Sequence, residues 1–177
     1  APIVHPYKCR CGTVVDSLGR HGISCKFAKG TYPRHLEINK ILERKLRKAQ
    51  VVASLEPTGL DKSSGLQPDG LTLFPWSMGK CLVWDFTCHD TLCQSSTHLT
   101  SNSAGKAAEK AEKDKRAKYR SFEQKFIVQP IANETLGSWG PEGLKFVEEI
   151  GARLITATKN KGSTSELFQA ISVATQR

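Results

Sequence analysis

Residues 68–87 read PDGLTLFPWSMGKCLVWDFT, in which two apolar runs are separated by a short break. The runs at 70–74 and 81–87 are rich in Leu, Thr, Val, Trp and Phe, and most of these residue types favour strands. Ser77-Met78-Gly79 between them is typical of a tight turn. The stretch therefore predicts an antiparallel β-hairpin.

Each strand of this hairpin carries one aspartate. Asp69 stands at the start of the first strand, and Asp85 lies within the second among bulky apolar neighbours. A pairing centred on Ser77 sets the two side chains opposite each other, about 5 Å apart and able to share a divalent ion, whereas a slip in the register would separate them. In the alternative interpretation, Asp69 caps a turn and Asp85 bonds to a local backbone amide. Glu56, which ends the preceding strand, is a candidate third oxygen ligand.

Hydrophobic periodicity around the hairpin predicts an α/β fold. Apolar residues spaced three and four apart predict helices at about 34–50, 104–122, 144–155 and 167–174. Apolar runs predict further strands at 51–56 and 126–132, and Pro130 suggests an edge or a bulge in the second of them. The polar stretch at 94–102 predicts a mobile loop. The expected order is helix, three strands, helix, strand and helices, preceded by a loop-built segment at 1–33.

The segment at 1–33 contains a set of metal-ligating residues. Cys9, Cys11, His21 and Cys25 supply three thiolates and one imidazole, the ligand set of a closed tetrahedral zinc site. Because the segment has few apolar residues, zinc would supply the energy that orders it. The alternative is a set of free cysteines with a surface histidine.

A second set of sulfur and imidazole groups has looser spacing and surrounds a polar loop. Its members are Cys88, His89, Cys93 and His98. We regard it as the weaker metal candidate, and Cys88 as an ordinary residue at a strand end otherwise. All six cysteines are expected to be reduced, because the chain has enough apolar residues for a core and shows no secretory signal.

The charge balance indicates a polyanionic partner. Twenty-six Lys and Arg against seventeen Asp and Glu leave a net charge of +9, which favours nucleic acid over a membrane surface. The longest apolar runs fall far short of the roughly 20 residues that a membrane helix needs, so we expect no membrane partner. The helix at 34–50 has a strongly basic polar side, and its candidate DNA contacts are Arg34, His35, Asn39, Lys40, Arg44, Arg47 and Lys48.

Two of these residues, His35 and Asn39, stand one helical turn apart. Both could face DNA or the acid cluster, or they could form an ordinary hydrogen bond with each other. On the helix at 104–122, Lys115 falls on the otherwise apolar stripe and Lys118 near its edge. A lysine that faces inward must either extend to solvent or meet carboxylates or phosphate.

Several motifs together resemble a known family. Pro68-Asp69, fifteen further residues and then Asp85-Phe86-Thr87, within this order of elements, resemble the nuclease core named for its PD-(D/E)XK motif. The wider pattern is similar to the restriction-like endonuclease domain that follows the reverse transcriptase in site-specific non-LTR retrotransposons. That pattern comprises the Cys-Cys-His-Cys set, Arg34-His35 with Asn39, the Pro-Asp pair, the Asp-x-Thr strand, and Lys115, Lys118 and Tyr119.

The resemblance implies a CCHC zinc knuckle at 1–33 and a restriction-endonuclease-like core at 34–177. It implies a Mg²⁺- or Mn²⁺-dependent DNA endonuclease that nicks target DNA to prime reverse transcription, with Asp69, Asp85 and Glu56 around the ion. Thr87 occupies the position of the motif lysine, so the resemblance suggests that Lys115, or Lys118 in its place, supplies that charge. The implied partners are DNA, element RNA and a reverse transcriptase domain in the same polypeptide, and the implied location is the nucleus.

Two other hypotheses fit the sequence. Because Thr87 carries no charge, the chain could be a catalytically inactive nucleic-acid-binding module that positions a retroelement polymerase. A zinc-stabilised interaction domain without a nucleic-acid role is the third hypothesis, and the basic charge argues against it.

Overall fold

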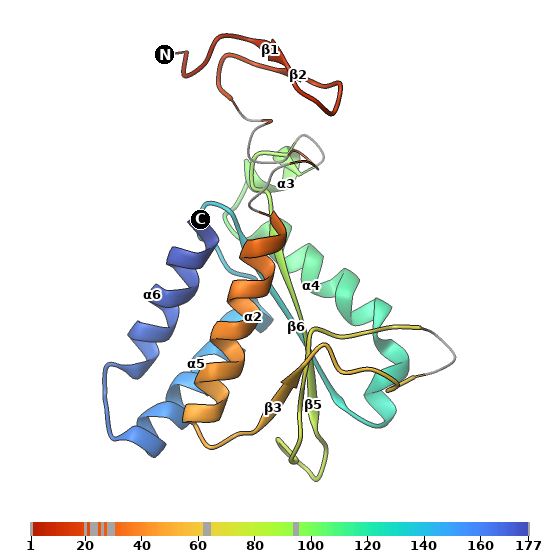
Figure 1. Ribbon diagram of the computed structural model, residues 1–177, viewed down its shortest axis with the longest axis vertical. Helices are drawn as coiled ribbons and strands as arrows, with labels where there is room; N and C mark the ends of the chain where they lie inside the picture. The colour runs from red at the N-terminus through yellow and green to blue at the C-terminus, as the bar shows by residue number, and fades with distance from the viewer. Residues whose placement is uncertain are drawn as a thin grey trace.

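The computed structural model describes residues 2–19, 21, 25, 27, 31–61, 65–93 and 96–176. Its centre is a four-stranded mixed sheet (Figure 1). The strands, in sheet order, are β3 (Ala53–Leu55), β4 (Gly70–Thr72), β5 (Leu82–His89) and β6 (Ile127–Glu134). Neighbours run antiparallel from β3 to β5, whereas β6 runs parallel to β5. The predicted α/β class is confirmed, and Pro130 lies in the strand at one edge of this sheet.

Helices cover both faces of the sheet (Figure 1). On one face lie α2 (Thr31–Lys48), α5 (Pro141–Thr158) and α6 (Ser163–Gln176), and on the other lie α4 (Lys106–Lys118) and the 3-10 helix η1 (Arg120–Gln124). Successive residues of a strand point to opposite faces, so β5 supplies both cores. Leu82, Trp84 and Phe86 pack under α2, α5 and α6, whereas Val83 packs under α4 and η1. The same alternation places Asp85 on the α4 face.

The pairing of β4 with β5 puts the two aspartates in register. Gly70 pairs with Trp84, and continuing this register places Asp69 opposite Asp85, the arrangement predicted from a centre at Ser77. The glycine is required here, because a Cβ at position 70 would lie 2.0 Å from a ring atom of Trp84. The backbone N–H of Asp69 donates to the carbonyl of Trp84 at 3.0 Å, which extends the pairing to the acid itself.

The turn of this hairpin is displaced from residue 77, the centre of the register in which β4 and β5 pair. Ser77 pairs with Lys80, and both residues at 78–79 adopt positive φ, as a two-residue hairpin turn requires. Residues 72–76 on the β4 side therefore face only 81–82 on the β5 side. The three additional residues are absorbed between the strands and the turn, so the predicted register holds although the turn is displaced.

The predicted order of elements is confirmed, with three local corrections. The stretch at 94–102, expected to be a mobile loop, contains the short helix α3 (Thr97–Thr100). The helix expected at 104–122 ends at Lys118 and continues as η1. The segment at 1–33, expected to lack strands, contains β1 (Tyr7–Lys8) and β2 (Val14–Val15), and α2 begins within it at Thr31. Among the described residues, no helix is long and apolar enough to span a membrane.

Candidate functional site

The four predicted zinc ligands lie together in the N-terminal segment. The Sγ atoms of Cys9 and Cys25 are 3.5 Å apart, and Sγ of Cys11 is 3.0 Å from Nε2 of His21. All four ligand atoms lie within 4.8 Å of one another. A tetrahedral site with Zn–S bonds of about 2.3 Å separates its sulfur atoms by about 3.7 Å, so this spacing fits one ion. The group could hold a metal such as zinc.

A short hairpin positions two of these ligands. β1 and β2 pair antiparallel, and the turn between them carries Cys9 and Cys11. The backbone N–H of Gly12 donates to the carbonyl of Cys9 at 2.9 Å, which closes this turn. Hydrogen bonds from the hydroxyl and then the backbone N–H of Thr13 lower the pKa of the Cys11 thiol from 9.0 to about 6. The lowered pKa favours the thiolate, which is the form that binds metal.

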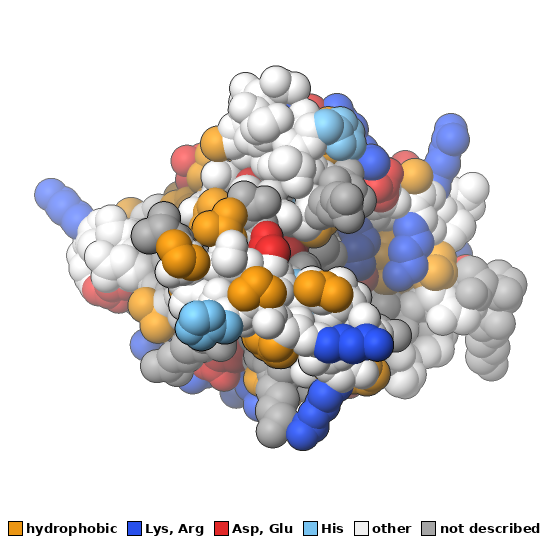
Figure 2. Space-filling model, turned by 90° about the horizontal axis from the view of Figure 1, so that it is seen from above, with side chains coloured by type: hydrophobic (Ala, Val, Ile, Leu, Met, Phe, Trp, Pro, Cys, Tyr) orange, Lys and Arg blue, Asp and Glu red, His pale blue; other side chains and the backbone are white. Residues whose placement is uncertain are grey.

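The N-terminal segment has almost no apolar core. Among its described residues up to Phe27, only Val15 and Cys25 are buried, whereas Ile3, Tyr7 and Val14 are 74%, 54% and 67% exposed. Figure 2 views the end of the molecule at which Figure 1 places β1 and β2, and it shows hydrophobic and basic side chains together there. With so little buried apolar surface, metal binding would be the main source of order in this segment.

Removal of the metal is therefore expected to melt the N-terminal segment and to leave the sheet folded. Elemental analysis should find about one zinc per chain, as one closed four-ligand site requires. Chelation, or the change Cys11→Ser, should make the segment up to Phe27 sensitive to protease while the fragment from α2 onward stays resistant. Cys81→Ser is the matched control, because Cys81 is a free thiol outside the group. A metal-free protein with a resistant N-terminal segment would contradict the prediction.

The second set of cysteines and histidines is engaged in other contacts. Nε2 of His89 lies 2.6 Å from the hydroxyl of Ser96 and 3.8 Å from Sγ of Cys93. Sγ of Cys88 accepts a hydrogen bond from Arg34 at 3.8 Å, and burial raises the pKa of this thiol. His98 is exposed. Within the described part of the chain, these residues do not gather as metal ligands, so the zinc set at 9–25 is the better candidate.

Asp69 is held from the side of α2. Its Oδ2 accepts a hydrogen bond from the backbone N–H of Phe86 at 2.6 Å and lies 3.0 Å from Nε2 of His35. That imidazole nitrogen also lies 3.2 Å from the carbonyl of Phe86. The hydrogen bond to Asp69 raises the pKa of His35, against the effect of burial. Two donors thus converge on Oδ2, which leaves Oδ1 as the oxygen available to a ligand.

Asp85 is held from the side of α4. It is only 6% exposed, and its Oδ1 accepts a hydrogen bond from the hydroxyl of Tyr119 at 2.7 Å. The same hydroxyl lies 2.8 Å from the carbonyl of Gln67, so the tyrosine links Asp85 to the segment before Asp69. Burial, and then the hydrogen bond to Asp85, raises the pKa of Tyr119. The phenol therefore stays protonated and acts as a donor.

The structure resolves the direction of the two helical lysines. Nζ of Lys115 forms an ion pair with Oδ2 of Asp85, and its side chain is 27% exposed. The lysine thus faces the acid instead of extending to bulk solvent. Lys118 lies farther out, with Nζ 3.3 Å from the hydroxyl of Tyr119 and 4.7 Å from the centre of its ring. Of the two lysines, Lys115 therefore carries the charge nearer to Asp85, in agreement with its place on the apolar stripe of the helix.

Glu56 is a weaker partner of the acids than the sequence suggests. It is exposed, and its backbone N–H donates to the carbonyl of Asp69 at 2.8 Å. Together with His35 and Asp69 it lines a cavity of about 230 Å³ between α2 and the start of β4. In the part of the chain that the structure describes, the zinc set is the only group of three or more ligating side chains close enough to share an ion. Glu56 therefore does not complete a three-ligand group with Asp69 and Asp85, which face each other across the hairpin.

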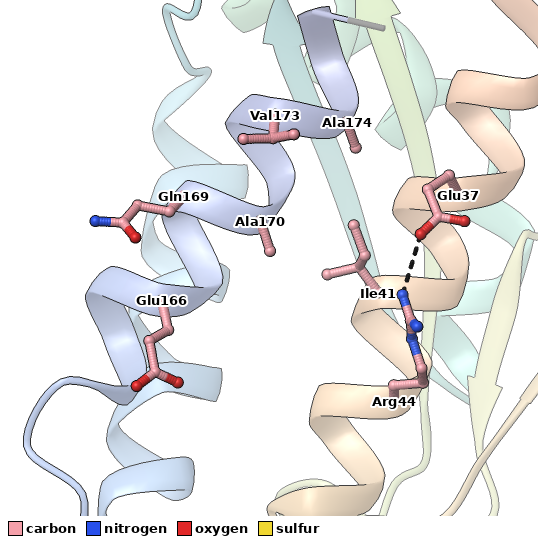
Figure 3. A pocket seen from close by; sticks show the side chains of 8 residues that line it. All are labelled: Glu37, Ile41, Arg44, Glu166, Gln169, Ala170, Val173 and Ala174. Atoms are coloured by element: carbon pink, nitrogen blue, oxygen red, sulfur yellow. Dashed lines mark hydrogen bonds and ion pairs between the residues drawn. The ribbon is translucent and has the colours of Figure 1, made fainter.

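Several of the candidate DNA-contacting residues of α2 are engaged within the protein. Asn39 is 4% exposed and therefore does not offer the expected DNA contact, but its Nδ2 lies 3.4 Å from Nδ1 of His35, which confirms the alternative of a hydrogen bond between the two. Arg44 pairs with Glu37 at 3.1 Å, and both line a groove between α2 and α6 (Figure 3). Arg47 pairs with Glu43 on the same helix.

The remaining basic candidates differ in exposure. Arg34 is half-buried and donates to Cys88, and His35 contacts Asp69. Lys40 and Lys48 are exposed, and neither has an ion pair among the described residues. These two lysines are therefore the members of the predicted set whose charge is most available to a phosphate.

Two buried glutamates were not predicted from the sequence. Glu112 is 1% exposed and accepts backbone hydrogen bonds from Gly143 at 2.7 Å, Glu142 at 3.0 Å and Ala132 at 3.3 Å. Glu134 is fully buried, and its Oε1 accepts from two backbone N–H groups in the first turn of α4. Each carboxylate thus caps the N-terminus of a helix whose own N-cap residue is a glycine without a side-chain cap.

Comparisons with known proteins do not assign the chain to a family. No family model matches it, and no curated protein matches it.

Proposed function

We propose that the chain is a metal-dependent DNA endonuclease domain of a retroelement protein, with a restriction-endonuclease-like core at 34–177 and a CCHC zinc knuckle at 1–33. The observation that carries the proposal is the pairing of Asp69 with Asp85 across the hairpin, with Lys115 in contact with the second acid. The order of elements and the parallel placement of β6 beside β5 are compatible with that core. The net charge of +9 suits a DNA substrate.

Each of the residues around the two acids would have a separate role in phosphodiester hydrolysis. Asp69 and Asp85 would hold Mg²⁺ or Mn²⁺, and carboxylate oxygens are the ligands that these ions prefer. The ion, when bound, supplies an activated water and neutralises charge on the phosphate. Tyr119 holds Asp85 through Oδ1, and Lys115, which contacts the same acid, would supply positive charge to the scissile phosphate in the transition state. Glu56 lines the cavity beside Asp69 and is proposed as a more distant ligand of the same ion.

The biological role follows from the resemblance. The nick would provide a primer end for reverse transcription, and a reverse transcriptase domain in the same polypeptide and element RNA are the proposed partners. The nucleus is the corresponding location. The exposed lysines of α2, Lys40 and Lys48, and the basic surface of the zinc knuckle would contact the DNA backbone.

A plasmid assay tests this proposal. The wild-type protein should convert supercoiled plasmid to the nicked form in Mn²⁺ and not in EDTA. Asp69→Asn and Asp85→Asn keep the side-chain shape and remove the charge, so each should lose both Mn²⁺ binding and nicking. Equal nicking by the wild type and Asp85→Asn would contradict the active-site assignment.

A catalytically inactive nucleic-acid-binding module is the second candidate. It is favoured by Thr87 at the motif position and by the fact that His35 and Lys115 already contact one oxygen of each acid. Such a module would bind DNA with a strong dependence on salt and with no effect of Mn²⁺. The nuclease would show a Mn²⁺-dependent activity that both Asp variants lose.

A further inference from the structure

A chain of side-chain hydrogen bonds leads from the buried core to Asp69. The indole Nε1 of Trp84, which is fully buried, donates to Oδ1 of Asn39 at 3.0 Å. Nδ2 of Asn39 lies 3.4 Å from Nδ1 of His35. Nε2 of His35 then lies 3.0 Å from Oδ2 of Asp69. The chain joins β5, α2 and the start of β4, and it ends on a proposed metal ligand.

The direction of every hydrogen bond in this chain follows from one donor. An indole N–H can only donate, so the atom of Asn39 that faces Trp84 must be the amide oxygen. The NH₂ group of Asn39 therefore faces His35, and Nδ1 of that imidazole must act as the acceptor. The remaining proton of the neutral ring is then on Nε2, where both neighbours, Oδ2 of Asp69 and the carbonyl of Phe86, are acceptors. The chain is consistent in this direction and in no other.

We infer that Asn39 is a positioning residue that fixes the Nε2–H tautomer of His35, and that His35 thereby orients Asp69. With Oδ2 held by His35 and by the backbone of Phe86, Oδ1 is the carboxylate oxygen that would bind the ion. This inference rests on the proposed function, because it takes Asp69 as a metal ligand. Asn39 is only 4% exposed, so its role lies inside the protein. This role differs from the DNA contact expected from its place on a basic helix.

Asn39→Ala and Trp84→Phe loosen the same chain from two sides. Asn39→Ala removes the amide, and Trp84→Phe removes the donor that fixes the amide while leaving an aromatic ring in the core. Long-range ¹H–¹⁵N spectra of the imidazoles, with His35→Gln used to assign the signals, report which nitrogen carries the proton. The wild type should show the proton on Nε2, and both variants should show a mixture of the two tautomers.

Metal affinity and kinetics test the consequence for Asp69. Loss of a group that hydrogen-bonds a metal ligand directly typically lowers metal affinity or activity by about 10- to 100-fold. Asn39 acts one residue further out, through His35, so for Asn39→Ala we expect the lower end of this range, about 10-fold, in Mn²⁺ affinity and in kcat, with little change in KM for plasmid. Lys40→Ala is the matched control on the next residue of the helix. It should weaken DNA binding and leave the tautomer of His35 and the affinity for Mn²⁺ unchanged.

The outcomes separate this inference from the proposed function. A wild-type His35 with its proton on Nδ1, or an Asn39→Ala protein that keeps the pure Nε2–H tautomer, overturns the inference whatever the activity. A mixed tautomer with unchanged Mn²⁺ affinity and a raised KM also overturns it, in favour of a DNA contact. If the wild type neither binds Mn²⁺ nor nicks plasmid, the proposed function fails and Asn39 cannot be positioning a metal ligand, even where the tautomer result holds.

Discussion

Replacing Lys115 with Met is expected to lower the rate of plasmid nicking by about 100- to 1,000-fold, the effect of removing one preorganised group that stabilises transition-state charge. Met keeps an unbranched side chain of similar length, so the change removes the charge and little packing. The ion pair with Asp85 shows that Nζ reaches the acid from α4. The measurement is the rate of loss of supercoiled plasmid in Mn²⁺ at saturating DNA.

Thr87, which stands where the PD-(D/E)XK motif has its lysine, provides a rescue experiment. Thr87 lies two residues after Asp85 on β5, so its side chain points to the same face of the sheet. Adding Thr87→Lys to Lys115→Met returns the charge to that face, and part of the lost activity should return with it. Lys113→Met is the matched control, because Lys113 pairs with Glu109 on the exposed side of the same helix.

Variants of Lys118, the alternative lysine, provide the result that would contradict the prediction for Lys115. If Lys118→Met lowers nicking more than Lys115→Met does, the functional charge belongs to Lys118, which lies against Tyr119. If neither variant nor Thr87→Lys changes the rate, no helical lysine replaces the motif residue.

The sequence was most informative where a short-range pattern decides a position. A pairing centred on Ser77 was one of the registers that the sequence allowed, and the structure has this register, with Asp69 opposite Asp85, although the turn is displaced from its expected centre. The inward direction of Lys115 followed from helical periodicity, because the residue shares a stripe with small and aromatic residues. These patterns act over a few residues and need no knowledge of the tertiary fold.

Contacts between distant elements could not be predicted in this way. The partner of Asn39 is an indole 45 residues away, and only the packing of α2 on β5 brings the two together. The basic residues around Asn39 suggested a DNA contact, which its burial contradicts, whereas the alternative hydrogen bond with His35, one helical turn away, is confirmed. Glu56 follows β3, the strand that pairs with β4, and so lies near Asp69. Its exposed side chain nevertheless does not join a set of ligands among the described residues.

Replacing Glu112 with Ala is expected to reduce the free energy of unfolding by about 3 kcal/mol, because three backbone N–H groups lose a charged acceptor in a buried place. For a protein of this size, a loss of that magnitude lowers Tm by about 6–12 °C. Burial raises the pKa of Glu112, while the three donors oppose that rise and favour the carboxylate. Glu109→Ala, which removes a surface glutamate from the same helix, should have a much smaller effect.

A double-mutant cycle with Gly140 separates the cap from general packing. A Cβ at position 140 would lie 2.3 Å from Cδ of Glu112, so Gly140→Ala should destabilise the wild-type protein although its backbone conformation suits alanine. In the Glu112→Ala background that clash is gone, and the same change should cost far less. The two substitutions are therefore expected to be strongly non-additive in thermal or denaturant unfolding. Additive losses would show that the carboxylate does not fill the space above the first turn of α5.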